Sequence, residues 1–167
     1  SATPAMLKIN QSVASSLLDT KMTGAVGLIK NGTGTLIVSN VTSTTIGNMV
    51  VSNGTLVVAI ANSLGLSTNV TVGGGTLELR TAEGITNAAT LSIADGAFMK
   101  IGAGLTQTVD RLFINGTQQI RGSYGKAASL PDHPDDVHFS GNGLLYVLKN
   151  PPIIPTNYTW DATGADT

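Results

Sequence analysis

Both histidines of the chain and three of its aspartates gather in one short stretch. These residues are Asp132, His133, Asp135, Asp136 and His138. Carboxylate and imidazole groups at this spacing are ligands for Ca²⁺ or Zn²⁺, so the stretch is a candidate metal site. The alternative is a solvated loop whose aspartates cap turns around two prolines, Pro131 and Pro134. We favour the loop, and we predict no metal, no cofactor and no catalytic residue.

A second set of charges suggests a different chemistry. Arg80, Asp110, Arg111 and Arg121 would suit a groove for an acidic polysaccharide, which a lyase cleaves with bound Ca²⁺ and a basic residue that removes a proton. The acidic residues of the chain are scattered, however, so we interpret these four as isolated surface charges. We therefore predict that the protein is not an enzyme.

Composition excludes several classes of protein. The 167 residues suit one domain, and only 11% are charged against about 25% in an ordinary soluble domain. A net charge of -1 offers no basic surface for nucleic acid. The absence of cysteine excludes disulfides and thiolate metal sites. No apolar run approaches the ~20 residues of a membrane-spanning helix, so we expect no transmembrane segment.

A short motif recurs along the chain. Gly-Thr-Leu begins at Gly34, Gly54 and Gly75, and related tripeptides begin at Gly96, Gly116 and Gly143. The first four steps between these glycines are each about 20 residues long, and the last step is longer. A nearly constant step of this size is typical of a solenoid. The long last step contains an apparent loop insertion, residues 121–140.

Strand-like segments flank each of these glycines, and two architectures fit them. Asn-Gly between two strands indicates an antiparallel hairpin, but it also suits the corner of a parallel β-helix. The period of about 20 residues favours the parallel β-helix, and a hairpin-based sandwich is the alternative. Equivalent side chains would then stack in apolar columns, Leu36 with Leu56 and Leu77, and Val38 with Val58 and Leu79. The expected corners are Asn53, Gly54, Gly74, Gly75, Asp95, Gly96, Asn115 and Gly116.

This arrangement predicts six to seven coils and a rod roughly 30 Å long, with coils ~4.8 Å apart. Its register is imperfect in the later coils. Aligning Gly96 on Gly75 puts Phe98 in the position of Leu77, and aligning Gly116 puts Gln118 there. A bulge or a taper would explain this. Residues 11–21 fit a short helix or an irregular β turn equally well.

The order of the motifs resembles a known family. The segments 28–38, 51–58 and 62–65 resemble the passenger-associated transport repeat of bacterial autotransporters, also called the autotransporter-associated β-strand repeat. Residues 112–116, 122–125 and 139–145 are similar to the closing segment of such arrays, and residues 158–161 to the opening of a following module. The resemblance implies a right-handed parallel β-helix on the outside of a bacterial cell, acting as a passenger or stalk.

We therefore expect a β-helix domain at residues 1–149 and a proline-rich tail at 150–167, in which residues 156–160 add one more strand. Neither end of the rod shows a strong cap in the sequence, which suggests that copies stack end to end into a filament, the tail of one reaching its neighbour. Adjacent modules of a longer chain are the other expected partners. Binding of surface glycans by an exposed face or by the 121–140 loop, and a polysaccharide lyase, remain alternative functions.

Overall fold

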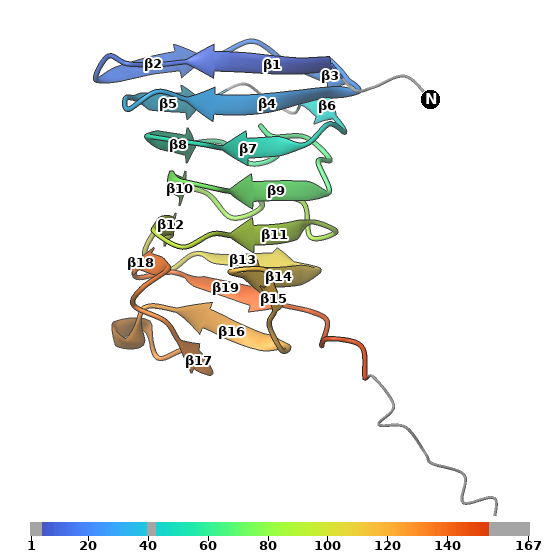
Figure 1. Cartoon of the computed structure of the whole chain (residues 1–167), viewed down its shortest axis with the longest axis vertical. Helices are drawn as coiled ribbons and strands as arrows, with labels where there is room; N and C mark the ends of the chain where they lie inside the picture. Colours follow the sequence, from blue (N-terminus) through green and yellow to red (C-terminus); the bar gives the residue numbers. More distant parts are fainter. Residues whose placement is uncertain (1–4, 40–42, 154–167) are drawn as a thin grey trace, which may run out of the picture.

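The computed structural model describes residues 5–39 and 43–153, and the strand expected at 156–160 lies outside these residues. The chain winds through short strands into a β-solenoid of about 5 turns, and the described residues contain no α-helix (Figure 1). In the two largest sheets, the strands contributed by successive windings pair in parallel. The prediction of a parallel β-helix is thus confirmed, and the hairpin-based sandwich is not the fold.

The first sheet keeps a constant step. Its six parallel strands are β1 (Ala5–Asn10), β4 (Val26–Asn31), β7 (Met49–Val51), β9 (Asn69–Val72), β11 (Thr90–Ile93) and β14 (Arg111–Ile114). One column of paired residues runs through all six, namely Ile9, Lys30, Val51, Val72, Ile93 and Ile114. The interval from each member to the next is the same throughout, so this sheet sets the period of the solenoid.

The second sheet contains the columns expected from the Gly-Thr-Leu motif. Its strands are β2 (Ser15–Leu18), β5 (Thr35–Val38), β8 (Thr55–Val58), β10 (Gly75–Leu79), β12 (Ala97–Ile101) and β18 (Phe139–Gly141). Leu36 pairs with Leu56, and Leu56 with Leu77. The parallel column joins Val38, Val58 and Leu79, and all six side chains are buried. Each such side chain contributes about 1.5–3 kcal/mol by leaving water.

Further short strands complete the windings. β3 (Thr23–Gly24) pairs with β6 (Thr44–Thr45), and β13 (Thr106–Val109) pairs with β19 (Leu144–Val147), both in parallel. Residues 11–21 contain β2 rather than a helix, so the β alternative holds for this segment. The described part of the chain has no helix long and apolar enough to cross a membrane.

The register of β12 corrects one expectation. Gly75 pairs with Ala97 rather than with Gly96, so Met99 and not Phe98 occupies the position below Leu77. The reason is one extra residue at the corner, because β12 starts later after Ile93 than β10 does after Val72. The slip turns Phe98 outward, where it is exposed, and puts Ile101 in the core.

The last winding is interrupted by a segment that we call the insertion, residues 115–138. It contains β15 (Thr117–Gln118), β16 (Gly122–Gly125), a 3-10 helix η1 (Ala127–Ser129) and β17 (His133–Pro134). The winding resumes at β18, which pairs with β12. The insertion therefore starts earlier than the expected 121, and Gln118 does not enter the second sheet. Because residues 115–138 form no coil, the turns number about 5 instead of six to seven.

The last two expected corners serve another purpose. Asn115 and Gly116 both have positive φ, 51° and 79°, and they join β14 to β15, which run antiparallel. Two such residues form the tight turn of a β-hairpin. The Asn-Gly pair is thus a hairpin turn and not a coil corner. Gly143, which the tripeptide pattern places at the head of a repeat, leads into β19 of another sheet.

The other corner residues lie where strands of the first sheet lead into the second sheet, and Gly75 is the first residue of β10. Gly54, Gly75 and Gly96 have φ of 67°, 77° and 71°, a region in which side chains other than glycine are strained. Asn53 accepts a hydrogen bond on its Oδ1 from the amide of Gly54 (2.7 Å). Gly74 and Asp95 occupy the same corner in their own windings, one residue before the positive-φ glycine.

Candidate functional site

The insertion brings the candidate metal ligands together, but its aspartate carboxylates accept hydrogen bonds from backbone amides. Asp135 Oδ1 accepts hydrogen bonds from the amides of Val137 and His138, both at 2.9 Å. Its Oδ2 lies 2.8 Å from His138 Nδ1. Burial raises the pKa of the Asp135 carboxyl, but the hydrogen bonds from His138 and Val137 outweigh burial and hold that pKa below its ordinary value. Asp135 thus acts as a clamp on the chain that leads into β18.

The other two aspartates hold the insertion in the same way. Asp132 Oδ2 accepts from the amide and the hydroxyl of Ser123 (2.9 and 2.7 Å), and these bonds lower the pKa of its carboxyl. Asp136 Oδ1 accepts from the amide of Ala127 (2.9 Å). Each carboxylate is therefore bonded to an earlier segment of the insertion, which folds the insertion back on itself.

The two histidines have different surroundings. The His133 ring packs on Tyr124, with centroids 4.7 Å apart, and its Nε2 lies 3.3 Å from the carbonyl oxygen of Arg121. Tyr124 is buried, which raises the pKa of its phenol, and it donates to the carbonyl of Ile120 (2.9 Å). His138 is buried against Asp135, and its Nε2 has no hydrogen-bond partner among the described residues. Within residues 5–39 and 43–153, no three His, Asp or Glu side chains lie close enough together to hold a metal ion.

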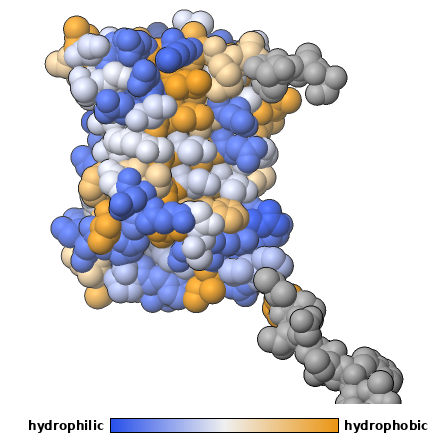
Figure 2. All heavy atoms as spheres, viewed as in Figure 1, coloured by the Kyte–Doolittle hydropathy of each residue, from blue (hydrophilic) through white to orange (hydrophobic). Residues whose placement is uncertain are grey.

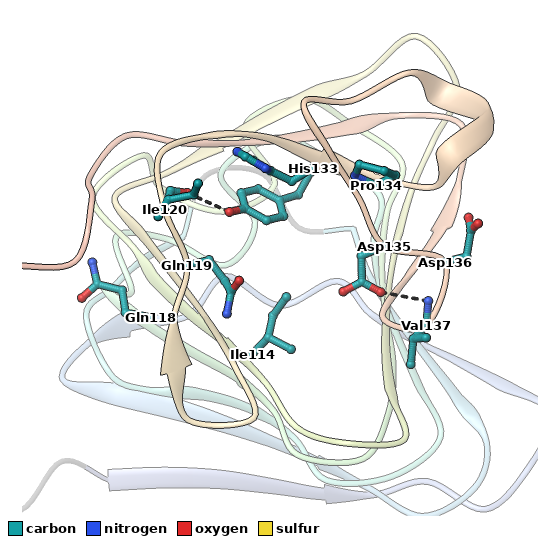
Figure 3. Close-up of a pocket in the computed structure, with 10 residues that line it drawn as sticks. Ile114, Gln118, Gln119, Ile120, His133, Pro134, Asp135, Asp136 and Val137 are labelled. Atoms are coloured by element: carbon teal, nitrogen blue, oxygen red, sulfur yellow. Dashed lines mark hydrogen bonds between the residues drawn. The ribbon is translucent and has the colours of Figure 1, made fainter.

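The insertion encloses an open pocket of about 580 Å³ at the end of the solenoid (Figure 3). Its lining residues are Ile114, Gln118, Gln119, Ile120, Tyr124, His133, Pro134, Asp135, Asp136 and Val137. Figure 3 shows Gln119 and Ile114 pointing into the space between the β15 hairpin and the Asp135–Val137 segment. Gln118 also lines a second pocket of about 560 Å³, and within the part of the chain that the structure describes its buried Nε2 lacks a hydrogen-bond partner. The sequence pattern placed Gln118 in the column of Leu77 and gave neither glutamine a role in a pocket. Their position after a possible hairpin turn is the signal that points to this role.

The four charges considered for a polysaccharide groove belong to separate groups. Arg80 pairs with Glu78 (2.7 Å), which also pairs with Lys100 (3.4 Å). Asp110 pairs with Arg111 (3.4 Å) and Lys149 (3.0 Å). No ion pair in the described part of the chain connects the two groups, and Arg121 lies in the insertion. These residues do not converge on one groove.

Loss of the Asp135 clamp should loosen the insertion without unfolding the solenoid. In Asp135→Ala, the amides of Val137 and His138 lose their acceptor, so we expect local opening to become about 1–2 kcal/mol easier. Hydrogen exchange should accelerate there and stay unchanged in β8. In the wild type, the clamp's contribution is present above the ordinary pKa of 3.8 and lost as pH falls through the lower folded pKa. Equal exchange rates in both proteins would contradict the assignment.

A buried lysine lies in the core column of the first sheet. Lys30 is fully buried, and its Nζ donates to the carbonyls of Asn31 (3.0 Å), Gly32 (2.7 Å) and Asn53 (3.1 Å). The ammonium therefore joins the corners of two successive windings. The sequence pattern did not single out Lys30, although a lysine at the repeat step of an apolar column is the signal that would have revealed it.

We expect Lys30 to make the free energy of unfolding depend on pH in the alkaline range. Burial lowers the pKa of Lys30 below its ordinary value of 10.5, so folding disfavours the charged form. The free energy of unfolding should therefore rise as pH increases through the folded-state pKa towards 10.5. In Lys30→Met this rise should disappear, and stability at neutral pH should fall by about 1–3 kcal/mol because three carbonyls lose a donor. Urea unfolding between about pH 8 and about pH 10.5 measures both effects. An identical pH dependence in the two proteins would refute the role of Lys30.

The two ends of the solenoid differ in how well the core is covered. One column of the first sheet runs from Leu7 through Leu28, Met49, Val70 and Leu91 to Leu112. Leu7 is 39% exposed, whereas Leu112 at the other end is fully buried. Figure 1 shows the insertion at the end opposite to β1. The expectation of two uncapped ends is thus wrong for the C-terminal end, because the insertion covers it.

The β1 end carries both apolar side chains and free backbone. β1 pairs only with β4, and β2 only with β5, so each strand keeps one edge without a partner among the described residues. Met6, Val13 and Leu17 are exposed there, and hydrophobic atoms reach the surface at this end, the top of Figure 2. Unpaired strand edges of this kind are templates for pairing with another chain.

Compared with known proteins, the chain matches no family model, no curated protein sequence and no solved structure.

Proposed function

We propose that this chain is a structural module of an extracellular bacterial surface protein, a passenger or stalk piece that joins further copies or adjacent modules end to end. One observation carries the proposal: the solenoid is closed by the insertion at one end and open at the other, where Leu7 is 39% exposed. A solenoid stacks each winding on the next, so an open end offers a ready seat for more β structure. The motif resemblance supports the external location.

A structural role also agrees with how the polar side chains are used. The carboxylates of the insertion are bonded to backbone amides, and Glu78 and Asp110 are in surface ion pairs. These contacts support a structural role, and the proposal includes no enzymatic activity. The rod itself, with a spacing of ~4.8 Å per winding, would be the working part.

The first experiment measures assembly of the whole chain. Light scattering after size exclusion, over a range of concentrations, should give a mass that grows with concentration. Negative-stain microscopy of the same samples should then show linear particles. A compact monomer at every concentration would overturn self-assembly. In the bacterium that produces the chain, antibodies against it should label intact cells, and labelling only after lysis would overturn the external location.

Glycan binding is the second candidate function, and the pocket of the insertion favours it. Its volume of about 580 Å³ falls in the usual range for small-ligand sites, and Gln118 and Gln119 supply amide groups that match sugar hydroxyls. A glycan array should detect binding by the intact chain. Gln119→Ala should abolish it, while Asn87→Ala, an exposed residue away from this pocket, should not. No signal on the array would remove this candidate.

A further inference from the structure

The open end needs an occupant with a free strand and an apolar face. Three core columns reach this end, and their last side chains are Leu7, Ile9 and Leu18. Beside them, β1 offers a six-residue edge whose alternate amides and carbonyls have no strand to pair with among the described residues. A single extended segment lying on this edge would satisfy the backbone and cover the apolar layer at once.

We infer that residues 156–160 of one copy add as a strand to the free edge of β1 in another copy. This inference rests on the proposed end-to-end function and names its connector. The sequence of that segment is Thr-Asn-Tyr-Thr-Trp. Thr156, Tyr158 and Trp160 share one face of an extended chain, while Asn157 and Thr159 share the other. The aromatic face suits the uncovered leucines, and the polar face suits water.

The start of the tail is tied to the far end of the solenoid. The Lys149 amide donates to the carbonyl of Asp110 (3.0 Å), and its Nζ pairs with the Asp110 carboxylate. Asn150 Oδ1 accepts from the amide of Arg121 (2.8 Å). Pro151 and Pro152 follow, and Ile153 is exposed. The tail therefore leaves from the covered end, at the bottom of Figure 1.

Reach decides that the pairing is between copies. From β1 to β14 there are five steps of ~4.8 Å, about 24 Å along the axis. Six residue steps lead from Asn150 to Thr156, and they span at most about 21 Å even if fully extended. The segment therefore cannot lie along β1 of its own chain, because Thr156 does not reach the level of β1 and the strand would still have to extend beyond Thr156. A neighbour stacked on the covered end brings its β1 within reach.

Charge adds to the fit. Residues 150–167 carry Asp161 and Asp166 and no basic residue. The first winding, residues 5–24, carries Lys8 and Lys21 against Asp19. The tail and the β1 end therefore attract one another, whereas two β1 strands would bring two copies of Lys8 close together. Tail-to-β1 pairing is favoured over β1-to-β1 pairing for this reason.

Crosslinking of mixed single-cysteine variants tests the pairing directly, because the chain has no cysteine of its own. Leu7→Cys protein is mixed with Tyr158→Cys protein and treated with a short bismaleimide. We expect a mixed dimer at a yield at least tenfold above that of the control, Phe98→Cys with Tyr158→Cys. Phe98 is a matched control because it is 40% exposed but lies in the middle of the rod. Met6→Cys, on the same strand, repeats the test if Leu7→Cys folds poorly.

The outcomes separate the inference from the proposed function. Assembly by light scattering without a mixed crosslink would overturn the tail as connector and leave end-to-end assembly standing. Crosslinking of Leu7→Cys with itself would assign the edge to a second β1 and also overturn the inference. A monomeric Leu7→Cys protein whose introduced thiol reacts freely would overturn both. Tyr158→Pro, which removes an amide donor, should abolish assembly, whereas Ala165→Pro should not.

Discussion

A chain with aspartate at position 56 is expected to be unfolded. Leu56 is buried between Leu36 and Leu77 in the second sheet, so a carboxylate there would lie between two apolar neighbours with no partner. Such a burial costs more than about 4 kcal/mol, which is a large part of the roughly 5–15 kcal/mol that stabilises a typical domain. Circular dichroism should show loss of the β signal, and no cooperative melting transition should remain.

The matched control for this variant is Leu66→Asp. Leu66 is an exposed leucine of the same winding, so its substitution should change stability by less than about 0.5 kcal/mol. If Leu56→Asp melts like the wild type, the two neighbours of Leu56 do not enclose it and the column assignment fails at this position.

Alanine at Gly54 should be the second most damaging change. Gly54 has a φ of 67°, and an added Cβ would collide with the carbonyl oxygens of Gly32 and Gly34 and approach Lys30 Nζ to 2.8 Å. The strained φ and the collisions together should destabilise the protein by roughly 2–5 kcal/mol. Urea denaturation at neutral pH gives the difference in unfolding free energy.

Gly96 separates the two causes. Its φ is 71°, almost the same, but a Cβ there meets nothing within 4 Å. Gly96→Ala should therefore cost only the conformational part, about 1–2 kcal/mol. Equal losses for the two substitutions would mean that close approach between windings does not restrict the corner.

The solenoid was predictable because both the residue types and the spacing of its repeat are visible in the sequence. Leu36, Leu56 and Leu77 keep the same place after each glycine, and a period of about 20 residues leaves few alternatives to a coil. The slip at β12 was not predictable, since Gly96 has the same left-handed backbone as Gly75 whichever residue follows it. Only the pairing of Leu77 with Met99 reveals the extra residue.

The insertion marks where local signals become ambiguous. Asn-Gly at 115–116 suits a corner and a hairpin equally. The outcome depends on the segment that follows, and among the described residues no further winding follows with which a continued coil could pair. The same holds for the polar cluster. The types of Asp135 and His138 allow metal binding, but their bonds depend on backbone amides whose positions no spacing reveals.

The constant step of the first sheet has a consequence for how such a rod can change size. Every interval in the Ile9–Ile114 column is equal, while the second sheet absorbs steps that differ slightly from one winding to the next at its corners. A tandem duplication of one full period, about 21 residues, between β4 and β10 would therefore add a whole winding. A deletion of the same size in this region would remove one winding. The length of the rod therefore changes in steps of ~4.8 Å, and duplication or deletion of one repeat in the gene changes it while the contacts between windings stay of the same kind.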